Sequence, residues 1–162
     1  MKVTSKAMNG GIIPDKYGKR GESMNEYGVP SCSVPITIED APEGTVCFSL
    51  VMEDKDAAPV CGFSWIHWIA ADITKTEIAE DDSVSAIDYV QGINSWFGTY
   101  GREGAIGYGG MTPPNAPHEY ELHIFALDKK LGLENGFFIN DMFHAMEGHV
   151  LERVTLTGTY SN

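Results

Sequence analysis

The chain has 162 residues, which is enough for one domain with a hydrophobic core and too short for two ordinary domains. Its hydrophobic share of 43% and aromatic share of 10% are typical of a globular protein and exclude a disordered chain. Eleven basic against 23 acidic residues give a formal net charge of −12, which disfavours nucleic acid and anionic membrane surfaces as partners. We therefore expect a single soluble domain over residues 1–162.

The cysteines indicate neither a metal ribbon nor a redox motif. Cys32, Cys47 and Cys61 form no Cys-x-x-Cys pair, and one of the three must stay unpaired within the chain. The amino end lacks the pattern of a secretory signal, and no apolar run approaches the length needed to cross a bilayer. These features predict a cytoplasmic protein without stable membrane insertion.

The first quarter of the chain predicts short strands joined by irregular structure. Residues 2–7 can form a short edge strand, whereas residues 14–30 show no periodicity. Residues 33–38 are rich in β-branched side chains but include Pro35, which favours an edge strand. A turn at residues 40–44 follows.

Two apolar strands come next. Residues 46–53 alternate with apolar side chains on both faces, so we expect this central strand to be covered on both sides. After a turn at residues 54–59, residues 63–71 form the next strand, with His67 between two tryptophans. Such a histidine is expected to be shielded from water.

Two connecting segments separate this part of the chain from the next strand. The acidic residues of segment 73–88 indicate a solvated connection more than a metal cluster, because they lack the spacing of a calcium loop. Segment 92–104 is a long loop with many glycines, and loops of that length in a compact domain are usually functional. It contains no dinucleotide-binding fingerprint.

Segment 107–128 changes character half-way. Its glycine and proline pairs exclude regular structure in the first half, and the second half alternates as a strand from His118. One face of that strand carries His118, Tyr120, Leu122, Ile124 and Ala126. A Gly-Gly loop with free N–H groups, followed by a histidine and a tyrosine on one face, suits a small anion pocket. The alternative is a hairpin entry that leads into a core strand.

The end of the chain predicts a helix and a closing strand. Residues 140–150 have helical periodicity, with Asn140 as the N-cap. Residues 153–160 alternate as a strand with a polar outer face. Strands outnumber helices along the chain, so we predict a mostly β fold with antiparallel pairing.

Three separate segments bring polar groups to the ends of buried elements. Asp54 follows the central strand, His67 lies in the next strand, and Gly110 precedes His118 and Tyr120. Buried polar side chains need partners. An Asp–His pair would fix the tautomer of the imidazole and leave its other nitrogen free to meet a ligand oxygen.

The motifs in these segments are Asp54-Lys55-Asp56-Ala57-Ala58-Pro59, Trp65-Ile66-His67-Trp68, and Gly109-Gly110-Met111-Thr112-Pro113-Pro114 with His118-Glu119-Tyr120. In them the sequence resembles the phosphatidylethanolamine-binding protein family, in particular its prokaryotic Raf kinase inhibitor-like branch. Further matches run in the same order over nearly the whole chain, from residues 10–17 to residues 145–160.

The resemblance implies a large antiparallel sheet packed on a smaller one, with a few peripheral helices including one near the C-terminus. It implies that a small pocket binds phosphate, acetate or a phosphorylated head-group without catalysis and without a cofactor or metal. The residues that it assigns to this pocket are Asp54, Trp65, His67, Gly110, His118 and Tyr120. It also suggests regulation of a kinase or protease partner, and a homodimer.

Three residues depart from the family pattern. Lys55 replaces a proline after Asp54, Met111 stands where a proline is usual and would soften the pocket rim, and Glu119 replaces an arginine beside His118. Strand alternation points Glu119 away from His118. These departures leave the affinity for a phosphorylated ligand open.

Two alternatives remain. A small hydrolase could use Asp54 and His67 as a base, although the chain has no Gly-x-Ser-x-Gly elbow and no sign of an activated cysteine. A metal site could use His67, His118 and Asp54, although no short ligand spacing supports it. The remaining histidines, His123, His144 and His149, are expected to be structural or exposed.

Overall fold

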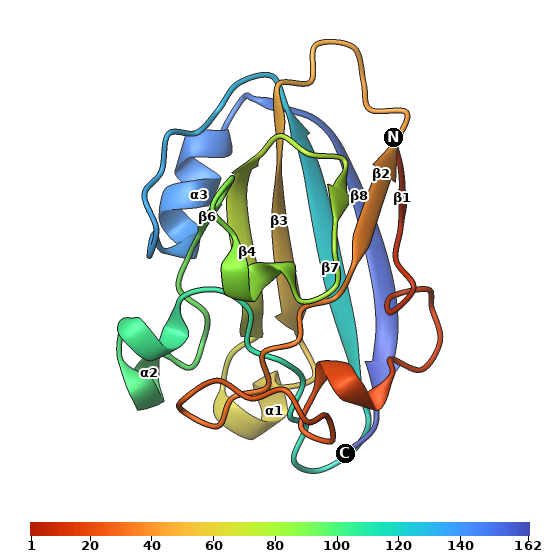
Figure 1. Cartoon of the computed structure of the whole chain (residues 1–162), viewed down its shortest axis with the longest axis vertical. Helices are drawn as coiled ribbons and strands as arrows, with labels where there is room; N and C mark the ends of the chain where they lie inside the picture. Colours follow the sequence, from red (N-terminus) through yellow and green to blue (C-terminus); the bar gives the residue numbers. More distant parts are fainter.

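The large sheet of the computed structural model has five antiparallel strands (Figure 1). The structure describes residues 1–162. In spatial order the strands are β6 (Val90–Gln91), β4 (Trp65–Ile73), β3 (Cys47–Asp54), β7 (His118–Leu127) and β8 (Val150–Tyr160). The central strand β3 pairs with β4 on one side and with β7 on the other. Because all neighbours are antiparallel, the end of β3 meets the start of both β4 and β7.

A smaller sheet of three strands packs on one face of the large sheet. It consists of β1 (Lys2–Thr4), β2 (Ile36–Glu39) and β5 (Glu77–Ile78), with β2 in the middle. The prediction of an edge strand at residues 33–38 was therefore wrong. Pro35 lies just before the first residue of β2, so its missing N–H group does not interrupt the pairing with β1 or β5.

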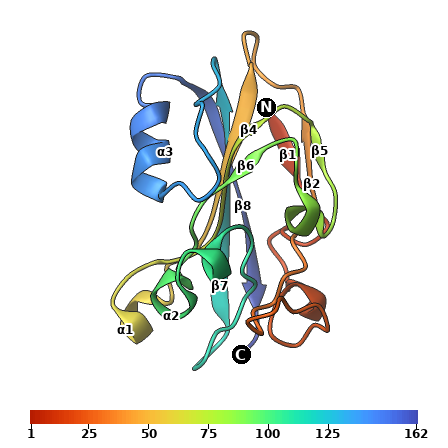
Figure 2. The same cartoon turned by 60° about the vertical axis from the view of Figure 1, so that its left-hand side comes forward.

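The two faces of β3 are buried in two different cores, as its sequence predicted. Phe48, Leu50 and Met52 belong to the larger core, to which the small sheet also contributes. Cys47 and Val51 belong to a second core beneath helix α3 (Ile139–Met146). Figure 2 shows α3 on one side of the large sheet and the small sheet on the other. The mostly β architecture with two packed sheets is thus confirmed.

The C-terminal helix is shorter than predicted. It begins at Ile139, and Phe138 rather than Asn140 is its N-cap residue. The carboxylate of Asp141 accepts the backbone N–H of Phe138 at 3.0 Å, which supplies the cap from inside the first turn. The helix ends at Met146, before Gly148 at a φ of +76° turns the chain into β8.

The other helical segments are single turns. Helices α1 (Ala58–Cys61) and α2 (Phe97–Tyr100) lie at the same end of the molecule (Figure 1). Short 3₁₀ turns occur at Asp15–Tyr17, Asp82–Ser85 and Glu103–Ala105. Segment 73–88 contains β5 and one of these turns, so it is more regular than predicted. None of the helices has both the length and the apolar character that a membrane span needs.

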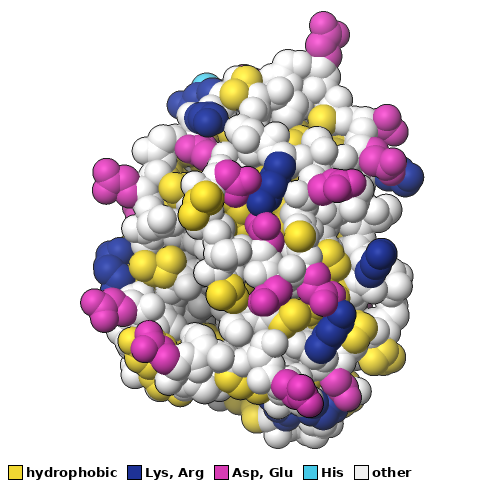
Figure 3. Space-filling model, viewed as in Figure 1, with side chains coloured by type: hydrophobic (Ala, Val, Ile, Leu, Met, Phe, Trp, Pro, Cys, Tyr) yellow, Lys and Arg dark blue, Asp and Glu magenta, His cyan; other side chains and the backbone are white.

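Acidic side chains are spread over the face shown in Figure 3. They alternate there with lysines and arginines and do not gather in one acidic field. On this face the excess of acidic side chains is therefore distributed and not concentrated in one patch.

Candidate functional site

A cavity of about 170 Å³ opens at the end of the large sheet where β3 stops and β4 and β7 begin. In the sheet register Asp54 lies opposite Trp65 on β4 and opposite Tyr120 on β7. The residues that line the cavity are Asp54, Ala57, Val60, Cys61, Trp65, His67, Trp96, Thr112, Pro113, Pro114 and His118. Four of the six predicted site residues are therefore in its wall: Asp54, Trp65, His67 and His118.

The buried acid–histidine pair of this cavity is Asp54 with His118. The two side chains meet at 2.8 Å between Oδ2 of Asp54 and Nδ1 of His118, and both residues are almost completely buried. The other carboxylate oxygen accepts the backbone N–H of Ala57 at 3.0 Å. The hydrolase alternative paired Asp54 with His67, whereas the hydrogen bond in the structure joins Asp54 to the histidine of β7.

His67 hydrogen-bonds to the backbone instead. Its Nδ1 faces the carbonyl oxygen of Gly109. A carbonyl can only accept, so Nδ1 carries the proton and Nε2 of the neutral ring is a bare acceptor. Burial lowers the pKa of His67, against the opposing influence of the Gly109 carbonyl and of Asp54. His67 is therefore a neutral ring with one lone pair available.

Asn115 covers the second nitrogen of His118. Its Oδ1 lies 2.9 Å from Nε2 of His118. Sequence reasoning left this nitrogen free for a ligand oxygen, and it missed Asn115, which lies in an irregular loop without periodicity. A ligand that reaches His118 has to displace this side-chain amide or share its hydrogen bond.

The glycine loop does not offer free amides to an anion. The N–H of Gly109 donates to the carbonyl of His67, and the N–H of Gly110 donates to the carbonyl of Pro30, each at 2.8 Å. A Cβ atom on Gly110 would lie 2.4 Å from the carbonyl oxygen of Tyr17. Gly110 therefore allows close packing of three backbone segments, and it lies outside the cavity lining.

Three buried hydrogen-bond donors around the cavity lack a partner. They are the indole nitrogens of Trp65 and Trp96 and the hydroxyl of Tyr120. Both tryptophans line the cavity, with their rings edge-to-face at 5.2 Å, and Tyr120 lies against the ring of His67, also at 5.2 Å. An unsatisfied buried donor costs about 1–3 kcal/mol. The indole N–H groups of Trp65 and Trp96 are thus donors in the cavity wall that a ligand with acceptor oxygens can satisfy.

No lysine or arginine lines the cavity. Lys55 forms an ion pair with Glu121 at 2.7 Å, and Glu119 is exposed with its backbone N–H bound to Asp56. Met111 is fully buried in the larger core and does not form the rim of the cavity. The three departures from the family pattern therefore lie outside the cavity wall.

The structure arranges the residues of the hydrolase alternative and of the metal-site alternative differently from what the sequence suggested. Cys61 lines the cavity, and its thiol lies 3.3 Å from the carbonyl oxygens of Ala57 and Phe63. The metal-ligating side chains that the structure gathers are Glu53, Glu121 and His123, not the set of Asp54, His67 and His118. His123 is buried and bonded across the strands to Thr155, in agreement with a cross-strand role.

The fold and the cavity define a class: a domain of two packed antiparallel sheets with a small pocket at one end of the larger sheet. Residues 3–161 match the family described as phosphatidylethanolamine-binding protein. The chain belongs to this family, as the sequence motifs indicated.

Relatives from bacteria agree with this assignment. The chain is 39% identical over 152 residues to an uncharacterized protein, YxkA, of Bacillus subtilis, covering 89% of this chain and 90% of that protein. It is 33% identical to a solved putative homolog of the family from Chlamydia trachomatis, with a TM-score of 0.81 over 99% of this chain and 96% of the other. YbcL of Escherichia coli, at 24% identity and a TM-score of 0.79 over 99% and 98% of the two chains, shares the fold.

Proposed function

We propose that this protein binds a small ligand through an oxyanion in the cavity between Asp54, His67 and His118, without catalysing a reaction. The observation that carries this proposal is the group of unpartnered donors around one cavity. Only one other buried side-chain group in the chain, the hydroxyl of Ser49, lacks a partner. Buried donors without acceptors are rare in folded proteins, so their gathering at one place favours a ligand with oxygen acceptors.

The charges of the cavity select among anions. The carboxylate of Asp54 repels an anion, and the cavity wall contains no lysine or arginine that would balance a second negative charge. The lone pair of neutral His67 also requires a proton between it and an oxyanion. We therefore propose that the ligand enters as a monoanion together with a proton on His67, or as a protonated acid. Acetate and a monoalkyl phosphate fit this description better than a polyanion.

The biological setting belongs to the same proposal. A phosphorylated head-group is the ligand that the family's descriptive name suggests, and the residues proposed to hold it are Asp54, Trp65, His67, Gly110, His118 and Tyr120. Gly110 and Tyr120 would act by supporting the wall, since neither lines the cavity. A regulated kinase or protease and a homodimer complete this proposal and rest on the family resemblance. We also propose a cytoplasmic location.

Calorimetric titration of the wild-type protein and of His67→Ala and His118→Ala with acetate, phosphate and O-phosphoethanolamine tests this proposal. Loss of a hydrogen bond to a charged group should weaken binding by about ten- to a hundredfold in each variant. His149→Ala is the matched control, because His149 pairs with Asp128 on a different part of the chain. Unchanged affinity in both pocket variants, with the fold intact by circular dichroism, would remove the cavity from the function.

A further inference from the structure

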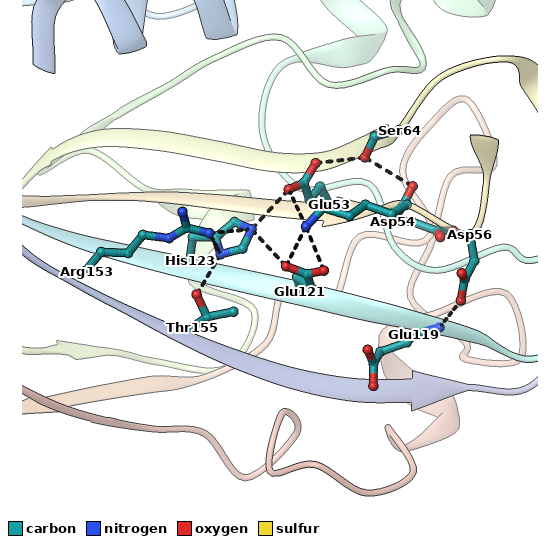
Figure 4. Close-up of polar contacts among 10 residues, drawn as sticks. Glu53, Asp54, Asp56, Ser64, Glu119, Glu121, His123, Arg153 and Thr155 are labelled. Atoms are coloured by element: carbon teal, nitrogen blue, oxygen red, sulfur yellow. Dashed lines mark hydrogen bonds and ion pairs between the residues drawn. The ribbon is translucent and has the colours of Figure 1, made fainter. Parts of the chain in front are cut away.

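A second cluster of polar side chains lies next to the cavity, on the opposite face of the large sheet. Glu53 precedes Asp54 on β3, and Glu121 and His123 follow Tyr120 on β7, so strand alternation places all three on the face away from Asp54. Figure 4 shows their side chains directed toward one another from the two strands. Nothing in the proposed ligand pocket uses them.

We propose that Glu53, Glu121 and His123 form a binding site for a divalent transition-metal cation such as Zn²⁺. One imidazole and two carboxylates are ligand types that zinc accepts, with a water molecule in the fourth position. In the structure the ammonium group of Lys55 lies against the same two carboxylates.

The spacing of the ligand atoms fits this cation. Glu53 and Glu121 are direct cross-strand partners, and His123 follows two residues later on the same face. Nε2 of His123 lies 3.0 Å from Oε1 of Glu53 and 3.5 Å from Oε2 of Glu121. Zinc bonds to nitrogen and oxygen are about 2.1 Å long, so ligand atoms at the corners of a tetrahedron are about 3.4 Å apart. Small side-chain movements therefore suffice to close the site.

The site already attracts a cation. Nζ of Lys55 lies 2.7 and 2.8 Å from the two oxygens of Glu121 and 3.6 Å from Oε1 of Glu53. The lysine side chain is 55% exposed, and ion pairs of such exposed groups are weak. A lysine side chain in this position can swing into solvent when a divalent cation replaces it. The side chains of Glu53 and Glu121 are 21% and 24% exposed, which leaves a path from solvent.

His123 has to change tautomer when the metal binds. Nη2 of Arg153 lies 2.7 Å from Nδ1, so in this arrangement Nδ1 accepts and Nε2 carries the proton that it donates to Glu53. A metal on Nε2 needs the proton on Nδ1, where the hydroxyl of Thr155 at 2.9 Å can accept it. Arg153 must then leave Nδ1. Figure 4 shows Arg153 and Thr155 beside this ring.

Two resident cations, Lys55 and Arg153, therefore compete with the metal. Lys55 pairs with the two carboxylates and Arg153 bonds to the ring of His123, whereas one Zn²⁺ would balance both carboxylates alone. Ser64 is a fixed support of the site, because its hydroxyl donates to Oε2 of Glu53 at 2.7 Å and leaves Oε1 for the metal. Removal of either resident cation should strengthen metal binding. Loss of a stabilising ion pair would by contrast lower the stability of the fold, so the two effects have opposite signs.

The test is titration with Zn²⁺ by calorimetry, and with Co²⁺ by visible absorption, which reports tetrahedral coordination. We expect one metal per chain in the wild type, with about tenfold tighter binding in Lys55→Ala. Glu121→Gln and His123→Gln should each weaken binding at least about tenfold. Glu119→Gln is the matched control, because Glu119 lies on the same strand and is exposed outside the cluster.

If His123→Gln fails to fold, the Zn²⁺ affinity of Glu121→Gln decides the test, because the side chain of Glu121 is partly exposed. Equal Zn²⁺ affinity in Glu121→Gln and Glu119→Gln would overturn the proposal, as would absence of Zn²⁺ binding in Lys55→Ala. Zn²⁺ affinity lost in a variant lacking both His67 and His118 would assign the metal to the ligand pocket instead, and would also contradict it.

Discussion

Replacement of Asp54 separates two roles of its carboxylate. Asp54→Ala leaves two buried donors without an acceptor, the N–H of Ala57 and Nδ1–H of His118. At about 1–3 kcal/mol for each donor, the expected loss in free energy of unfolding is about 2–6 kcal/mol. Breaking a buried charged pair typically costs about 3–5 kcal/mol, which lies within the same range.

Asp54→Asn has a different expected outcome because the amide keeps the shape of the side chain. Its oxygen can still accept from Ala57, and its NH₂ group can donate to Nδ1 of His118. His118 would then carry its proton on Nε2, where Oδ1 of Asn115 at 2.9 Å accepts it. All three hydrogen bonds can be made in this variant, and only the bond between residue 54 and Nδ1 of His118 changes direction. The expected loss in stability is about 1 kcal/mol, together with a change of the His118 tautomer.

Urea unfolding at neutral pH measures the two losses, and ¹⁵N chemical shifts of the imidazole nitrogens report the tautomer. Asp56→Asn is the matched control, because Asp56 is exposed on the same turn. Equal destabilisation by Asp54→Ala and Asp54→Asn, or an unchanged His118 tautomer in Asp54→Asn, would refute the pairing described here.

Three further predictions use other parts of the site. Burial lowers the pKa of both His67 and His123 below the ordinary 6.5, so the unfolded chain binds more protons near that pH, and stability falls as the pH drops below it. Each histidine changes the free energy of unfolding by up to about 1.4 kcal/mol per pH unit. The fall in stability should be smaller in His67→Gln than in the wild type, as measured by urea unfolding between pH 5 and pH 8. Trp65→Phe removes a donor without a protein partner, so the expected change is about three- to tenfold weaker acetate binding with a stability within about 1 kcal/mol of the wild type. Gly110→Ala should lose about 1–3 kcal/mol because its Cβ would meet Tyr17 at 2.4 Å, whereas Gly98→Ala, with nothing within 4 Å, should not; equal thermal midpoints would contradict this.

The strands were predictable because successive side chains of a strand point to opposite faces of the sheet, which leaves a two-residue pattern in the sequence. The alternation of β7 from His118 placed Tyr120, Leu122 and Ile124 on one face, and all three lie in the larger core. The burial of β3 on both faces followed from its apolar side chains on both sides. This alternation follows from the pleat of the strand alone, so it does not depend on which elements the strand packs against.

The wall of the cavity was predictable only in part. The motifs indicated that Asp54, His67 and His118 would meet, and they did. The histidine that pairs with Asp54 was not predictable. Strands β4 and β7 both flank β3, and the sequence does not indicate which of their histidines lies within hydrogen-bond distance of Asp54. The hydrogen bonds of Asn115 and Gly110 depend on irregular loops, where no periodic pattern indicates the partner.

A crystal structure of the protein soaked separately with acetate and with phosphate tests the central claim most directly. The account predicts electron density for an oxyanion between Asp54, His67 and His118, with one oxygen within hydrogen-bond distance of Nε2 of His67 and a second near an unpartnered donor of the wall. It also predicts higher occupancy at pH 5.5 than at pH 8, because the oxyanion requires a proton on His67. Density for bound ligand elsewhere only, or an occupancy that rises with pH, would contradict it.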